Sequence, residues 1–73
     1  MKKNSHITMD GTITNAMGYE NFRVQLENDF EILCTPSGKM RLHHIKLMPG
    51  DRVQVEMSPY DLTRGRIVYR YRS

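Results

Sequence analysis

The stretch Phe22-Arg23-Val24-Gln25-Leu26-Glu27 has the clearest two-residue period in the chain. Successive side chains of a β-strand point to opposite faces, so this pattern predicts a half-buried strand with its apolar residues inward and Arg23 outward. Residues that favour turns flank it on both sides, from Asn15 to Asn21 and from Glu27 to Asp29. The stretch is therefore expected to form a strand bounded by two turns.

The same alternation recurs in four other segments of the chain. Strands are predicted over residues 6–14, 30–35, 52–57 and 66–72. In the first, Gly11 lies on the inward row, where a missing side chain permits the sharp bend that a small barrel needs. In the second, Phe30 is expected to point inward with Ile32 and Cys34.

The last strand carries a row of cations. Its alternation places Ile67, Tyr69 and Tyr71 on one side and three arginines on the other, at Arg66, Arg70 and Arg72. Residues two apart on a strand are separated by about 7 Å, so such a row can follow a phosphate backbone. A turn at residues 58–61 is expected to open a loop that runs to Gly65 before this strand begins.

Between the third and fourth strands the period changes. Lys39 to Met48 is predicted to be helical, with Lys39, His43 and Lys46 on one face, because residues three and four apart share a face. Pro36 ends the preceding strand, and Pro49-Gly50-Asp51 stops the helix. The predicted fold class is all-β, a five-stranded Greek-key barrel of the OB type with a short helix between strands 3 and 4, and an SH3-like barrel is the alternative.

Size and composition agree with one small domain. A chain of 73 residues buries only about 60% of its unfolded surface. Residues 6–73 are expected to form a single domain after a mobile leader of residues 1–5. The one cysteine, Cys34, has no disulfide partner in the chain and is expected to be a core residue. Since no long apolar segment occurs, neither a membrane nor secretion is indicated, and we expect a monomer in the cytoplasm or an organelle interior.

The net charge of +3 conceals an asymmetry. Residues 1–37 carry three basic and five acidic groups, whereas residues 38–73 carry eight basic and three acidic groups. A positive field in the second half can attract a polyanion, and arginine suits phosphate because of its planar guanidinium. The chain is therefore predicted to bind nucleic acid through a surface that combines Lys39, Arg41, Lys46, Arg64, Arg66, Arg70 and Arg72.

Other kinds of site are not indicated. His43 and His44 are adjacent and have no second cysteine or carboxylate pair to complete a metal site, so neither a metal nor a cofactor is expected. His43, beside the lysines, is expected to contact phosphate or base. No nucleophile elbow or P-loop occurs, which predicts a protein that is not an enzyme. Few aromatic residues are available to stack on bases, which favours recognition of structured RNA.

Several motifs point to a family. These are Gly11-Thr12, Phe22-Arg23-Val24, Leu26-Glu27-Asn28, Ser37-Gly38-Lys39-Met40-Arg41, Gly50-Asp51-Arg52-Val53, and Pro59-Tyr60-Asp61-Leu62 followed by Arg64-Gly65-Arg66-Ile67-Val68. They occur in order over almost the whole chain, which resembles bacterial and chloroplast translation initiation factor 1.

The resemblance implies an OB-fold protein that docks in the decoding A site of the small ribosomal subunit. Its expected partners are ribosomal RNA, the ribosomal protein beside that site and the other initiation factors, with which it favours correct start selection. A chloroplast copy would act in the stroma. By motif, the implied RNA contacts are Arg23, Lys39, Met40, Arg41, Lys46, Arg64, Arg66 and Arg70.

The chain departs from the common family pattern after Arg41. Family members often continue with a basic residue, an asparagine and an aromatic, where this chain has Leu42, His43 and His44. Because histidine can stack and hydrogen-bond, His44 is expected to keep the aromatic role. Two alternatives to a ribosomal role stay open: a cold-shock-like RNA chaperone, and a barrel that binds proteins and uses its charge for solubility.

Overall fold

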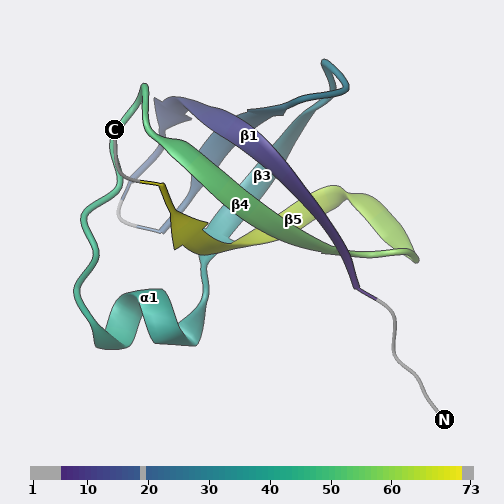
Figure 1. Cartoon of the computed structure of the whole chain (residues 1–73). Coiled ribbons are helices and arrows are strands. Elements are labelled where there is room, and N and C mark those ends of the chain that lie inside the picture. Colours follow the sequence, from purple (N-terminus) through teal and green to yellow (C-terminus); the bar gives the residue numbers. More distant parts are fainter. Residues whose placement is uncertain (1–5, 19, 72–73) are drawn as a thin grey trace, which may run out of the picture.

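The chain folds into a closed barrel of five strands (Figure 1), seen in a computed structural model that describes residues 6–18 and 20–71. In chain order the elements are β1 (Ile7–Ala16), β2 (Phe22–Leu26), β3 (Glu31–Pro36), α1 (Gly38–Leu42), β4 (Arg52–Ser58) and β5 (Asp61–Arg70). Around the barrel the strands follow the order β1-β2-β3-β5-β4, and β4 pairs again with β1. Only β3 and β5 pair in parallel among the strand pairs of the described residues. This is the predicted five-stranded OB-type barrel with its helix between the third and fourth strands. The predicted leader lies outside the described residues.

The alternation seen in the sequence corresponds to burial in the barrel. Phe22, Val24 and Leu26 of β2 are buried, while Arg23 and Gln25 between them are exposed. The core also takes Val53, Val55 and Met57 from β4, two residues from β3, and one residue each from β1, α1 and β5. Cys34 lies in this core as expected, and burial raises the pKa of its thiol to about 12.

Gly11 is required where β1 crosses β2. A Cβ atom at this position would lie 2.7 Å from Cγ1 of Val24 and 2.8 Å from the carbonyl oxygen of Gln25. The two strands therefore approach more closely than any side chain at position 11 allows.

The predicted helix over Lys39 to Met48 is shorter than expected. α1 starts after Ser37, whose Oγ accepts a hydrogen bond from the Met40 amide at 3.2 Å. It ends in a Schellman motif, in which the Ile45 amide donates to the Met40 carbonyl and the His44 amide donates to the Arg41 carbonyl. His44 has a positive φ of 52°, so the chain leaves the helical path at that residue. Lys46 consequently lies on an extended connector and shares no helical face with Lys39.

The prediction for Phe30 was also wrong. Its side chain is 68% exposed. Asp29, with a φ of 71°, closes the turn after β2, and Phe30 still belongs to that turn because its carbonyl accepts from the Leu26 amide at 2.7 Å. Inward alternation in β3 starts only with Ile32.

β5 differs from its prediction in two ways. It begins at Asp61, immediately after the expected turn, so the segment up to Gly65 is strand and not loop. It also contains a β-bulge: Ile67 pairs with Val55 and Tyr69 pairs with Gln54, which leaves Val68 without a partner on β4. After the bulge, the side chains of β5 fall on the opposite faces from those the simple alternation predicts.

Candidate nucleic-acid interface

α1 presents two cations to solvent from one end of the barrel. Figure 1 shows the helix projecting from the barrel near the ends of β3 and β5, the two strands that it contacts. Lys39 and Arg41 are exposed on it. Both lie in the last turn, where a positive charge is favoured by the partial negative charge of the helix C-terminus. The two predicted contact residues thus extend beyond the barrel wall.

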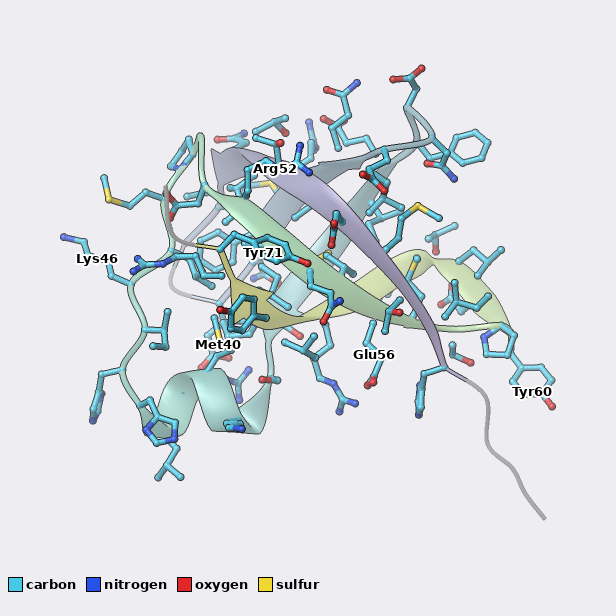
Figure 2. The ribbon with its side chains drawn as sticks, viewed as in Figure 1. Met40, Lys46, Arg52, Glu56, Tyr60 and Tyr71 are labelled. Atoms are coloured by element: carbon cyan, nitrogen blue, oxygen red, sulfur yellow. The ribbon has the colours of Figure 1, made fainter. Side chains whose placement is uncertain are left out.

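Met40, between them, has a different place. Its side chain is only 6% exposed and belongs to the core cluster. Figure 2 shows it on the side of α1 that faces the barrel. The Met40 side chain is therefore not exposed to RNA in this structure, and the expected RNA contact of Met40 stays a prediction. Met40 attaches the short helix to the barrel.

Carboxylates hold three of the predicted arginines. Arg41 pairs with Glu20 at 3.0 Å, which links α1 to the connection between β1 and β2. Arg23 lies 3.7 Å from Glu31 of β3, and Arg66 pairs with Glu56 of β4. Each carboxylate offsets part of the positive field that its arginine presents to a polyanion.

Three exposed cations of the predicted set, Lys39, Lys46 and Arg64, make no ion pair within residues 6–18 and 20–71, and the half-buried Arg70 makes none either. The three exposed cations carry the uncompensated part of the positive charge, and an RNA phosphate can approach them without displacing a protein carboxylate.

The expected row of three guanidiniums does not form on one face. Arg66 pairs with Glu56, which alternates with the buried Val55 and Met57 and therefore points outward. Arg70 pairs with the buried Val53, on the inward row at the end of the barrel. The bulge at Val68 separates the two arginines in this way. Arg72, the third member, lies outside the described residues.

Arg70 fastens the connector that follows α1. Its Nη1 donates a hydrogen bond to the carbonyl oxygen of Lys46 at 2.7 Å. The side chain is half-buried, and the bond joins residues 24 positions apart in the chain. Arg70 therefore holds in place the segment from which Lys46 extends (Figure 2).

Two surface hollows that the sequence did not predict lie beside Arg64. One, of about 260 Å³, is lined by Asn21, Leu33, Cys34, Thr35, Arg64 and Gly65. The other, of about 530 Å³, shares Leu33 and Arg64 and adds Arg23, Glu31, Ile32 and Thr63. Leu33 stands between the two as an exposed apolar residue on the outer face of β3. The sequence held one sign of this feature, because Leu33 is an apolar residue on an otherwise polar outward row.

The two histidines lie beside the cations of α1. Both are exposed; His43 caps the helix and His44 occupies the left-handed position that follows. No group of three potential metal ligands occurs in the part of the chain that the structure describes. The exposed imidazoles can hydrogen-bond to a ligand that approaches from solvent.

Two tyrosines that were expected to face the same way as Ile67 lie on the outer surface instead. Tyr69 is 52% exposed, and its ring meets that of Tyr71 edge to face with 5.1 Å between centroids. The Tyr71 hydroxyl donates a 2.6 Å hydrogen bond to Oδ1 of Asp10 on β1. This bond to the carboxylate is the main cause of a raised pKa at Tyr71. In Figure 2, Tyr71 lies across the outer face of β4.

The fold and the distribution of cations together define an OB-fold protein with a basic surface at one end of its barrel, formed by Lys39 and Arg41 of α1 and Lys46 of the connector. A family model described as translation initiation factor 1A / IF-1 matches residues 1–73, so the chain belongs to this family of translation initiation factors. Among the described residues, no helix is long and apolar enough to cross a membrane.

Two solved structures are similar to this one. The solution structure of translation initiation factor 1 from the Wolbachia endosymbiont strain TRS of Brugia malayi has a TM-score of 0.76 and 41% identity, over 93% of this chain and 80% of that one. The crystal structure of YjeQ from Thermotoga maritima has a TM-score of 0.72 and 27% identity, over 90% of this chain but only 23% of that one. The shared region is thus most of the Wolbachia initiation factor and a minor part of YjeQ.

Proposed function

We propose that this initiation factor binds the decoding A site of the small ribosomal subunit through its basic surface and assists the other initiation factors in start selection. The observation that carries the proposal is the pair of exposed cations on α1, Lys39 and Arg41, which project from the end of the barrel. The exposed Lys46, which makes no ion pair within residues 6–18 and 20–71, lies farther along the connector that follows the helix (Figure 2). Membership of the translation initiation factor 1A / IF-1 family supports it.

The mechanism is recognition without chemical turnover. Exposed cations contact RNA phosphates, and the release of counterions favours binding. Phosphate contacts of this kind set register and orientation, while shape decides which folded RNA fits. No step in this mechanism requires a metal or a cofactor.

We keep in the proposed set of RNA contacts the predicted residues that are exposed, namely Arg23, Lys39, Arg41, His43, His44, Lys46, Arg64 and Arg66. We do not include Met40, whose side chain belongs to the core, or Arg70, whose guanidinium is bonded to the connector. Arg72 stays in the proposed set on its charge alone. The adjacent ribosomal protein and the other initiation factors are further proposed partners, and the protein acts as a monomer in the cytoplasm, or in the stroma if it is a chloroplast copy.

Chemical footprinting on purified small subunits tests the proposal. Wild-type protein should protect nucleotides of the decoding site, and Lys39→Ala and Arg64→Ala should weaken that protection while the melting temperature stays within about 2 °C, because neither exposed side chain makes an ion pair that the fold would lose. Tyr60→Ala is a control, since Tyr60 is also exposed and carries no charge. Absence of protection, together with tight binding to any short unstructured strand, would favour the chaperone alternative instead.

A further inference from the structure

The outer face of β1, β4 and β5 holds an aromatic pair that the basic surface does not include. The bulge at Val68 sets Tyr69 opposite Gln54, which alternates with the buried Val53 and Val55 and so points outward. Without the bulge, Tyr69 would follow Ile67 into the core. A bulge beside a functional surface often re-aims a side chain in this way.

The pair is held in a fixed arrangement. Tyr71 packs edge to face against Tyr69, and its hydroxyl is bound to Asp10 across β4. Asp10 itself is half-buried on β1 and pairs in register with Gln54. An aromatic ring that is already positioned loses little conformational entropy when a ligand stacks on it.

Two arginines, Arg66 and Arg52, lie near this pair, each with a carboxylate partner of its own. Arg66 lies on the same outer face of β5, opposite Glu56, and Gln54 and Glu56 are about 7 Å apart along β4. Arg52 is close enough to Tyr71 to act on its pKa in the direction opposite to Asp10. An exposed ring with guanidiniums nearby fits a nucleotide, because the base stacks on the ring while its phosphates pair with the arginines.

We propose that Tyr69, supported from behind by Tyr71 and Asp10, is a stacking platform for one unpaired base of single-stranded RNA. It forms a second contact region, on a different face of the barrel from the hollows that β3 residues and Arg64 line. The proposal rests on the RNA-binding function given above and adds a base-stacking site to it. The partner is an unpaired RNA base and its phosphate, recognised without regard to sequence.

Binding of matched oligonucleotides tests this site. The probes are a ten-nucleotide oligoadenylate and an abasic strand of the same length and charge. The protein has no tryptophan, so its fluorescence reports its tyrosines directly. Tyr69→Ile removes the ring but suits a strand, Tyr69→Phe keeps the ring, and Tyr60→Ala changes a tyrosine that is 95% exposed at the β4–β5 turn (Figure 2).

The expected results separate stacking from charge. Stacking contributes about 1 to 3 kcal/mol per base, so Tyr69→Ile should weaken oligoadenylate binding about 5- to 150-fold and leave the abasic strand unchanged. Tyr69→Phe and Tyr60→Ala should bind like the wild type, and oligoadenylate should quench the wild-type fluorescence more than that of Tyr69→Ile.

Three outcomes would overturn the proposal. The first is an equal loss of affinity for oligoadenylate and for the abasic oligonucleotide in Tyr69→Ile, and the second is no loss of affinity for either. The third is a defect of Tyr69→Ile confined to assembly with the other initiation factors, which would make the tyrosine pair a protein contact. The small-subunit footprint is measured on the same proteins. A wild type that fails to footprint but stacks oligoadenylate through Tyr69 removes the ribosomal proposal alone, and the reverse removes only the platform.

Discussion

Replacing Glu20 by glutamine (Glu20→Gln) removes the carboxylate that holds the Arg41 guanidinium at 3.0 Å. Glu20 holds this guanidinium in the free protein, so an RNA phosphate that binds Arg41 has to compete with Glu20 for it. We therefore expect Glu20→Gln to bind the small subunit more tightly than the wild type, although the substitution removes an ion pair.

The magnitude follows from two contributions. Both side chains are about half exposed, and exposed ion pairs contribute roughly 0.2 to 1 kcal/mol, which RNA binding would no longer have to disrupt. A carboxylate and a phosphate on either side of one guanidinium lie about 6 Å apart, and their repulsion in water is about 0.7 kcal/mol. Together they give about 0.9 to 1.7 kcal/mol, or about a 5- to 18-fold gain in affinity. The loss of folding stability should stay below about 1 kcal/mol.

The assay is equilibrium binding to purified small subunits at several salt concentrations. Arg41→Ala and the Glu20→Gln/Arg41→Ala double variant complete a cycle, since a gain that passes through Arg41 disappears when Arg41 is absent. Asp29→Asn is the matched control: it removes the same charge from an exposed residue that makes no ion pair within residues 6–18 and 20–71, and asparagine tolerates its φ of 71°. Weaker binding by Glu20→Gln would refute the reasoning and mean that Glu20 positions Arg41 for RNA. A gain that persists in the double variant would refute it as well, because only net charge would then matter.

Three further predictions concern stability. Gly11→Ala should destabilise the fold by about 1 to 3 kcal/mol or more, because the new Cβ meets Val24 and the Gln25 carbonyl. Gly38→Ala has open space around it and should be neutral or stabilising, and thermal melts of the two variants test the difference. Met40→Ala should cost about 2 to 5 kcal/mol in urea denaturation, since it empties a core position, while Leu42→Ala, on an exposed neighbour, should stay within about 0.5 kcal/mol, and equal effects would contradict the buried position of Met40. The Cys34 thiol has a folded pKa of about 12 against an ordinary 9.0, so above pH 9 the unfolded state loses the thiol proton first. The free energy of unfolding should therefore fall with rising pH, by about 1.4 kcal/mol per pH unit up to pH 12, relative to that of Cys34→Ala. Urea titrations of both proteins at about pH 8 and about pH 10 would detect this difference.

Local patterns predicted most of the barrel because its core depends on a two-residue period. Phe22, Val24 and Leu26 point into the core, as their alternation with polar residues predicted, and Gly11 lies where two strands cross. The turn before β5 was likewise evident from Pro59. These features depend on neighbours within a few residues, which a single sequence displays directly.

Features that depend on distant partners could not be predicted. Helix α1 ends early because His44 adopts a left-handed conformation, and a histidine gives no sign of this in the sequence where a glycine would. The pairing of Glu20 with Arg41 joins residues 21 positions apart and exists only after the barrel has closed. The sequence thus shows the cations and the carboxylates of the site, but it does not show which carboxylate pairs with which arginine.

The bulge at Val68 has the largest consequence for function. One unpaired residue in β5 sends Arg66 and Arg70 to opposite faces and brings Tyr69 to the surface. A continuous row of guanidiniums would follow one strand of phosphates, whereas this arrangement assigns different tasks to the same residue types. Arg66 stays exposed on the same outer face as Tyr69, where it pairs with Glu56, and Arg70 holds the connector that carries Lys46. Because the connector depends on Arg70, the loss of that side chain should weaken RNA binding through Lys46 as well, so a loss of affinity in Arg70→Ala does not by itself make Arg70 an RNA contact.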